Sequence, residues 1–227
     1  KTGLALNYNR WIGDSAIGTI AATQRLWGFG SLGLSYGIVQ VPGLEYLVNE
    51  TDTPEKFDVI NSLLGITYAL PLGKYFAVGI AGKSVNETIG PGKTYANYHN
   101  SAVLFDAGIL ARGILDYFNV SLTAQNYGIS NTFKTPSNIK LGVALDVANS
   151  LVLVTDINIP ADNKPNIHAG LELSLIKSLF LRVGYKTNTE KLGGLTGLAA
   201  GFGITFNPVA FDFAWIPQGT AFGDTYR

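Results

Sequence analysis

Stretches of about ten residues in which apolar and polar side chains alternate recur along the whole chain, and this alternation is the period of a β-strand. The connections between them alternate between short and long. The short ones are 27–30, 71–74, 112–113, 149–150, 177–178 and 207–208, and the long ones are 42–56, 87–98, 127–137, 160–165, 187–194 and 217–224. An up-and-down sheet has this asymmetry when every second connection lies at the same end. Transmembrane β-barrels combine such ends with strands of about 9–11 residues.

The composition narrows the class of protein. Apolar residues make up 47% of the 227 residues, but no run of about 18 apolar residues is present, so no transmembrane helix is predicted. Charged residues make up 14%, against about 25% in ordinary soluble domains. The net charge is zero, which gives no basic surface for nucleic acid.

The alternation predicts thirteen strands and the beginning of another. We place them at 2–12, 16–26, 31–41, 57–70, 75–85, 100–111, 114–126, 138–148, 151–159, 166–175, 179–187, 195–206 and 209–216, with the last beginning at 225–227. Bacterial single-chain barrels have even strand numbers. We therefore expect an all-β fold, a transmembrane antiparallel up-and-down β-barrel of about 14 strands.

Alternation alone leaves two architectures open. In a membrane barrel the apolar face of each strand meets lipid, whereas in a soluble sandwich it points into the core. Three features favour the membrane barrel. The polar faces hold mostly Gly, Ser, Thr, Asn and Ala, and the strands are long for a soluble sheet. Aromatic residues also gather near predicted strand ends, as in an interfacial girdle: Trp11, Trp27, Tyr36, Tyr68, Tyr75, Tyr117, Phe118, Tyr185, Phe206 and Trp215.

The closing segment carries a family resemblance. It reads Leu181-Arg-Val-Gly-Tyr185, Gly201-Phe-Gly203, Phe211-Asp-Phe-Ala-Trp215, Ile216-Pro-Gln-Gly219 and Phe222-Gly-Asp-Thr-Tyr-Arg227. This succession resembles the C-terminal half of PorV-like outer-membrane proteins, within the FadL-type fatty-acid-transporter superfamily. Phe222 and Tyr226 stand where that family has Leu and His.

The resemblance implies a 14-stranded barrel in the bacterial outer membrane, in contact with its lipid. It also implies two kinds of role, a place in type IX secretion beside other envelope proteins or the passage of hydrophobic molecules. The family's Gly-rich N-terminal segment and its final strand have no counterpart here. We therefore expect residues 1–227 to form a single barrel domain without those two parts.

The polar strand faces supply the candidate site. Six of their charged residues, on neighbouring predicted strands, form a candidate polar cluster in the lumen: Lys140, Asp146, Asp156, Glu172, Arg182 and Lys186. Cross-strand contact is expected for Asp146, Asp156, Glu172 and Arg182. The cluster is interpreted either as a pore lining or solute site, or as an ion-pair network that neutralises itself, and the second interpretation is favoured because unpaired buried charge is costly.

A second candidate lies in the long connection 42–56. Leu44, Tyr46, Leu47 and Val48 form an apolar cluster next to Glu50, Asp52 and Glu55. Such a loop either docks a protein partner or folds over the mouth of the barrel.

Nothing in the sequence indicates catalysis, a cofactor or a metal. There are two His and no Cys, and neither a metal-ligand spacing nor a Ser–His–Asp grouping is present. The segment Gly28-Phe-Gly-Ser-Leu-Gly33 has the spacing of a dinucleotide loop but opens a predicted strand rather than a helix. We therefore expect a non-enzymatic barrel that binds or passes a partner or solute at the cell surface. A passive porin or hydrophobic-molecule channel, and a soluble or fibre-forming all-β protein, are the alternatives.

Overall fold

The computed structural model describes residues 2–10, 14–46, 54–90, 98–131, 134–188, 195–218 and 224–226. In this part of the chain β-strands account for nearly all the regular structure. They are β1 (Thr2–Arg10), β2 (Ala16–Leu26), β3 (Gly30–Tyr46), β4 (Glu55–Leu72), β5 (Phe76–Ile89), β6 (Tyr98–Ile114), β7 (Phe118–Ser130), β8 (Asn138–Ala148), β9 (Leu151–Pro160), β10 (Asn166–Ile176), β11 (Leu179–Lys186), β12 (Leu198–Phe206), β13 (Val209–Pro217) and β14 (Asp224–Tyr226).

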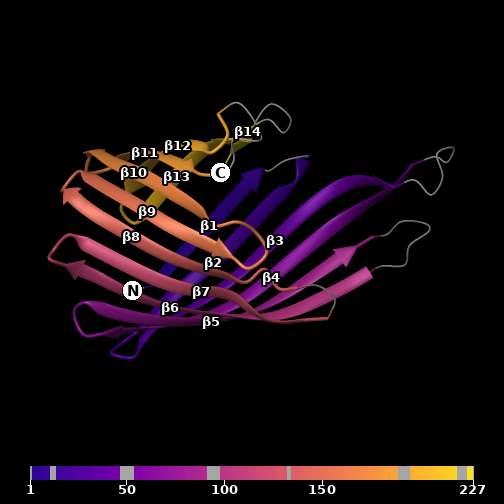
Figure 1. Ribbon diagram of the computed structural model, residues 1–227, viewed down its shortest axis with the longest axis horizontal. Coiled ribbons are helices and arrows are strands. Elements are labelled where there is room, and N and C mark those ends of the chain that lie inside the picture. Colours follow the sequence, from indigo (N-terminus) through magenta and orange to yellow (C-terminus); the bar gives the residue numbers. More distant parts are fainter. Residues whose placement is uncertain are drawn as a thin grey trace.

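Every strand pairs antiparallel with its neighbours in the chain, and β14 closes the sheet against β1 (Figure 1). The closing contact pairs Arg10 with Tyr226, and β14 also pairs with β13 through Trp215. The prediction of an antiparallel up-and-down barrel with about 14 strands is confirmed. No helix among the described residues is long and apolar enough to cross a membrane.

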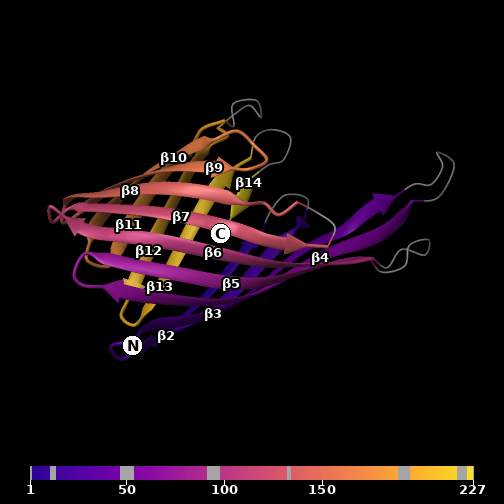
Figure 2. The same ribbon diagram turned by 60° about the horizontal axis from the view of Figure 1, so that its bottom comes forward.

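The two ends of the barrel differ, as the connections predict. Tight turns join β2 to β3, β4 to β5, β6 to β7, β8 to β9, β10 to β11 and β12 to β13, and we call this the short-turn end. The other connections lie at the opposite end, the long-loop end (Figure 2).

Strands β3 to β6 are longer than predicted. They span 14 to 18 residues, whereas β8 to β13 span 8 to 11. The extra length projects beyond the rest of the wall at the long-loop end (Figures 1 and 2). We call this part, residues 39–46, 55–63, 84–89 and 98–104, the extension.

Three of the predicted loop boundaries are therefore wrong. The ladder between β3 and β4 continues past Pro42 because a bulge between Val41 and Leu44, with Gly43 at a positive φ of 65°, absorbs the irregularity. Strand β5 continues to Ile89 and β7 to Ser130, because both keep backbone partners on β6.

The turn predicted at 112–113 is also displaced. A second bulge, between Ala111 and Ile114, carries β6 through Gly113, and the turn follows at residues 115–117. Leu115 and Asp116 hold the positive φ angles of that turn, 52° and 68°. The turn therefore lacks the glycine that marks such positions in a sequence.

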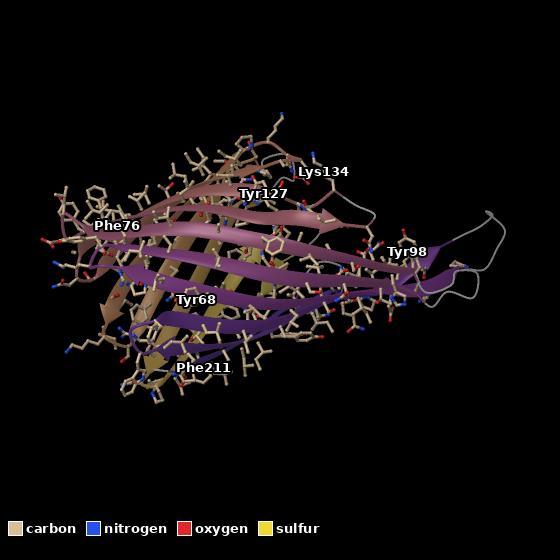
Figure 3. All side chains as sticks on the ribbon, turned by 90° about the horizontal axis from the view of Figure 1, so that it is seen from below. Tyr68, Phe76, Tyr98, Tyr127, Lys134 and Phe211 are labelled. Atoms are coloured by element: carbon tan, nitrogen blue, oxygen red, sulfur yellow. The ribbon has the colours of Figure 1, made fainter. Side chains whose placement is uncertain are left out.

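The barrel has almost no closed core. Among the described residues, the buried aliphatic side chains are those of Ala102, at 3% exposure, and Leu104, at 4%. Both lie on β6 opposite β7, where the strands are in close contact: a Cβ added to Gly128 would overlap the backbone of Val103 and Leu104. Large apolar side chains instead stand on the outside of the wall, among them Tyr68, Phe76, Tyr127 and Phe211 (Figure 3).

Candidate functional site in the lumen

The register of the ladders assigns one face of each strand to the outside and the other to the lumen. On β13 Phe211 stands outside (Figure 3), so Asp212 faces the lumen. Across the sheet, Leu171 lies level with Leu153 and Val183 on the outside, and Glu172 lies level with Arg182 on the inside. The apolar outer face and polar inner face have the order of a membrane barrel, not that of a soluble sandwich.

One ionic group in the lumen centres on Arg182 of β11. Its Nε donates to Glu172 Oε2 on β10 at 2.6 Å, and its Nη1 donates to Asp212 Oδ1 on β13. The guanidinium therefore crosses β12 to reach β13. Gly203 lies on β12 between the two partners, and a Cβ there would come within 2.9 Å of Arg182 Nη1. The absent side chain leaves room for this contact.

A second group lies nearer the long-loop end. His168 Nδ1 on β10 lies 3.1 Å from Asp156 Oδ1 on β9. Lys186 is the register partner of His168 on β11, and Lys140 on β8 is the partner of Asn158. Both lysines therefore face the lumen close to this pair.

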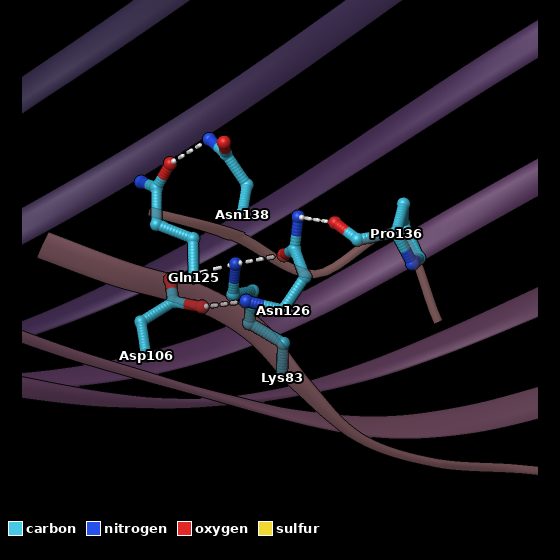
Figure 4. Close-up of polar contacts among 6 residues, drawn as sticks. All are labelled: Lys83, Asp106, Gln125, Asn126, Pro136 and Asn138. Atoms are coloured by element: carbon cyan, nitrogen blue, oxygen red, sulfur yellow. Dashed lines mark hydrogen bonds and ion pairs between the residues drawn. The ribbon is translucent and has the colours of Figure 1, made fainter. Parts of the chain in front are cut away.

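A third group occupies β5, β6 and β7 (Figure 4). Lys83 Nζ lies 2.6 Å from Asp106 Oδ2 and donates to Asn126 Oδ1 at 2.7 Å. Asp106 Oδ1 accepts the backbone N–H of Asn126 at 2.8 Å. A bulge between Phe105 and Ala107 takes Asp106 out of the β6–β7 ladder. The carboxylate thus replaces the missing strand partner.

Amide side chains continue this polar row toward β9. Asn138 Nδ2 donates to Asn158 Oδ1 at 2.6 Å and contacts Gln125 Oε1 at 3.4 Å, and Asn126 Nδ2 donates to the carbonyl of Pro136 at 3.3 Å. Hydrogen-bonding side chains of the lumen are thereby linked across five strands, β5 to β9.

The six predicted cluster residues do not form one group. Arg182 and Glu172 are ion-paired, while Asp156 pairs with His168. Asp146 lies apart, near the short-turn end, where its Oδ2 accepts from Asn119 Nδ2 at 3.2 Å. Sequence reasoning left Lys83, Asp106, His168 and Asp212 out of the predicted cluster, although each of them forms an ion pair in the lumen. It missed Asn126, whose φ of 60° has no signal in the sequence.

The other side of the lumen, β1 to β4, carries mainly small, hydroxyl, amide and apolar side chains, with Arg25 near the short-turn end of β2. Inward positions there include Gly33, Ser35, Thr67 and Ala69. Closer to the extension the inner face becomes apolar, and a cavity of about 440 Å³ is lined by residues that include Ile17, Val39, Leu63 and Val85. The described lumen is therefore charged on one side and largely neutral on the other.

Within β3 to β6 the polarity of the two faces is reversed along the strand. On β4 the outer face changes from Leu64, Ile66 and Leu70 in the body of the barrel to Lys56, Asp58 and Ser62 in the extension. The inner face changes in the opposite direction. The inward apolar residues of the extension are Val39, Val41, Leu44, Phe57, Val59, Leu63, Val85, Ile89, Ala102 and Leu104.

This reversal has a few exceptions in the described residues. Ile60 and Val103 are apolar on the outer face, and on the inner face Asn100 donates to Glu87 Oε1 at 2.9 Å. The sequence of 57–70 already contains this change of face. The apolar residues at its start have odd numbers (Phe57, Val59 and Leu63), whereas those at its end have even numbers (Leu64, Ile66, Tyr68 and Leu70). Sequence reasoning did not use it.

Of the predicted docking cluster, Leu44 and the backbone of Tyr46 lie among the described residues, at the end of β3 in the extension. Leu44 is 38% exposed and belongs to β3, opposite Phe57. Glu45 beside it lies 3.5 Å from Lys56. The side chain of Tyr46, and Leu47 and Val48 altogether, lie outside the described residues. The docking role remains a prediction.

Solved structures with the same architecture include the toluene transporter TodX of Pseudomonas putida, at 11% identity and a TM-score of 0.61, over 99% of this chain and 85% of that one. A deletion mutant of the TodX monoaromatic hydrocarbon channel gives a TM-score of 0.64 at 11% identity, over 99% and 86%. The chain therefore has the same β-barrel fold as TodX.

The barrel also resembles CdiB from Acinetobacter baumannii, at 10% identity and a TM-score of 0.53, over 99% of this chain and 52% of that one. No family model matches the sequence, and no curated protein does. The expected likeness to a barrel of this architecture is therefore confirmed by structure alone. Within the described part of the barrel, no group of three or more His, Cys, Asp or Glu side chains is placed to hold a metal ion.

Proposed function

We propose that this chain is a non-enzymatic outer-membrane channel for small apolar molecules, with its long-loop end outside the cell. The observation that carries the proposal is the reversal of polarity along β3 to β6. A wall surrounded by lipid is apolar outside, and a wall surrounded by water is polar outside. The extension therefore stands in water, and it keeps its apolar side chains on the inner face, toward the lumen.

Such an inner face gives an apolar molecule a surface on which to leave water. The cavity of about 440 Å³ at its base has the volume of a small-molecule site. The proposal is also supported by the fold of TodX, a toluene transporter.

We assign a structural role to the charged side of the lumen. Its main charges are ion-paired. Arg182 pairs with Glu172 and Asp212, and Lys83 pairs with Asp106. Paired charges of this kind hold the wall together and present little net charge to a solute. They do not form the one-sign ring that selects ions in a pore.

Binding of the apolar dye N-phenyl-1-naphthylamine to the refolded protein in detergent tests the proposal. Leu63→Gln and Val85→Gln each replace an inward apolar side chain of the cavity. We expect each to weaken dye binding about tenfold, since burial of one such side chain contributes about 1.5–3 kcal/mol. The matched control is Ser84→Gln, which places the same side chain on the outer face, one residue from Val85.

Equal affinity in all three variants contradicts the proposed entry surface. Single-channel conductance in a planar bilayer then separates the alternatives. A silent, dye-binding barrel supports a channel for apolar molecules, whereas a steady ohmic current supports a passive porin. A protein that stays folded and monodisperse without detergent contradicts the membrane location itself.

A second candidate function is docking of a protein partner, as in a PorV-like secretion role. The observation that favours it is the exposed Leu44 at the tip of the extension. Because the extension projects beyond the rest of the wall (Figure 2), an apolar residue at its tip is accessible to another protein. Leu44 shares the inner face of the extension with Phe57. The result that favours this function is therefore loss of a cross-linked partner on Leu44→Asp, with dye affinity reduced less than in Leu63→Gln.

A further inference from the structure

The short-turn end carries an excess of exposed cations. Lys74, Arg112 and Lys177 are exposed, and they lie in or beside three of the six tight turns, so they are distributed around the circumference. Arg25, also exposed, lies on the lumen face of β2 opposite Ser31. The acids in the same described segments, residues 25–31, 71–76, 112–118, 146–151, 175–179 and 206–210, are Asp116 and Asp146. Asp146 faces the lumen, toward Asn119.

The same turns expose large apolar side chains. Trp27 is 90% exposed, Phe29 75% and Leu115 68%. Lys74 Nζ lies 4.9 Å from the ring centroid of Tyr75 and 3.2 Å from its hydroxyl. Aromatic rings beside cations suit a membrane interface, where the ring lies against lipid and the charge stays in the polar layer.

The turns also lie at the level where the apolar band ends. Ile176, 65% exposed, directly precedes Lys177, and Phe206, 64% exposed, directly precedes the β12–β13 turn. Phe76 begins β5 immediately after the β4–β5 turn and stands outside (Figure 3). No polar stretch of strand separates these side chains from the turns, so the turn cations lie in the headgroup layer.

We propose that the short-turn end is a binding surface for anionic phospholipid headgroups, with Lys74, Arg112 and Lys177 as the residues that contact phosphate. This inference rests on the membrane location proposed above. Ammonium and guanidinium groups donate hydrogen bonds to phosphate oxygens. A headgroup that has no cation of its own carries an uncompensated negative phosphate charge, which the protein cations can neutralise. Phosphatidylglycerol therefore gathers at this end in preference to phosphatidylcholine.

Fluorescence quenching by brominated lipids tests this surface. The Trp11→Phe/Trp215→Phe variant leaves Trp27, in the β2–β3 turn, as the sole tryptophan. It is refolded into mixed bilayers in which either phosphatidylglycerol or phosphatidylcholine is brominated. We expect brominated phosphatidylglycerol to quench Trp27 as though enriched about threefold, and the enrichment to fall in high salt. The protein with all three tryptophans should show the same order with a smaller difference.

The triple variant Lys74→Gln/Arg112→Gln/Lys177→Gln should abolish the enrichment. Its matched control is Lys56→Gln/Lys134→Gln/Lys164→Gln, which removes three exposed charges from the long-loop end and should leave the enrichment unchanged. Equal quenching by the two lipids in the parent, or enrichment that survives the triple variant, overturns the inference alone. Absence of quenching by either lipid overturns the membrane location as well.

Discussion

At the scale of single residues, Arg182 links three elements of the wall. It pairs with Glu172 on the preceding strand and with Asp212 two strands further on. The side chains are 40%, 33% and 61% exposed, so water screens both ion pairs. Each pair is therefore worth about the 0.2–1 kcal/mol of a solvent-accessible salt bridge.

Arg182→Gln removes both ion pairs and leaves Glu172 and Asp212 without their shared cation. We expect a loss of about 1 kcal/mol in the free energy of unfolding, measured by urea titration in detergent micelles. A double-mutant cycle with Asp212→Asn should give a coupling energy of about 0.5 kcal/mol, and a coupling of zero contradicts the contact. Lys164→Gln, an exposed loop residue, is the control.

Gly203→Ala tests the same contact without removing a charge. Its Cβ would displace the ends of Asp212 and Arg182, both of which can rotate away at little cost. We expect the variant to keep nearly the stability of the parent while the coupling between residues 182 and 212 disappears. Persistent coupling in this background means that Gly203 does not determine the path of the guanidinium.

At the scale of elements, β6 and β7 depend on close approach of their backbones. A Cβ on Gly128 overlaps backbone atoms of Val103 and Leu104, which cannot rotate away as a side chain end can. Gly128→Ala should cost about 1–3 kcal/mol, the range for overpacking, with a lowered thermal unfolding midpoint. In Gly184→Ala the nearest atom is 3.7 Å from the new Cβ, so little change is expected there.

The element scale also shows where sequence reasoning succeeds and fails. Alternation located every strand, because the period of a strand is a property of its side chains. It placed the ends of β3, β5 and β7 too early, because pairing with a neighbouring strand extends a strand through residues of low strand propensity, such as Pro42 in β3.

The candidate site was only partly predictable for a related reason. Parity assigned the charged residues to the lumen face, but which charges meet depends on the register and on gaps such as Gly203. Arg182 reaches past its neighbouring strand to Asp212, a contact that no pairwise count along the sequence contains. The positive φ of Asn126 likewise follows from a bulge formed by two strands together.

At the scale of the whole molecule, the assignment of inside and outside can be tested with adjacent residues. Val143 faces outward in the middle of β8, level with Val120 and Thr155, and Ala144 faces the lumen. Val143→Lys should cost about 2–4 kcal/mol in a lipid bilayer, the range for a cation at the midplane. Ala144→Lys should cost much less, because water reaches the lumen. Equal costs contradict the membrane barrel.

In the proposed channel, the unequal height of the wall has a consequence for selectivity. A molecule that arrives from water meets the tall, inwardly apolar side of the barrel before it meets the charged side. Entry at this end therefore depends first on how readily a compound partitions out of water, and only afterwards on its molecular shape. Compounds of different shape but similar oil–water partition should therefore compete with one another at the entrance.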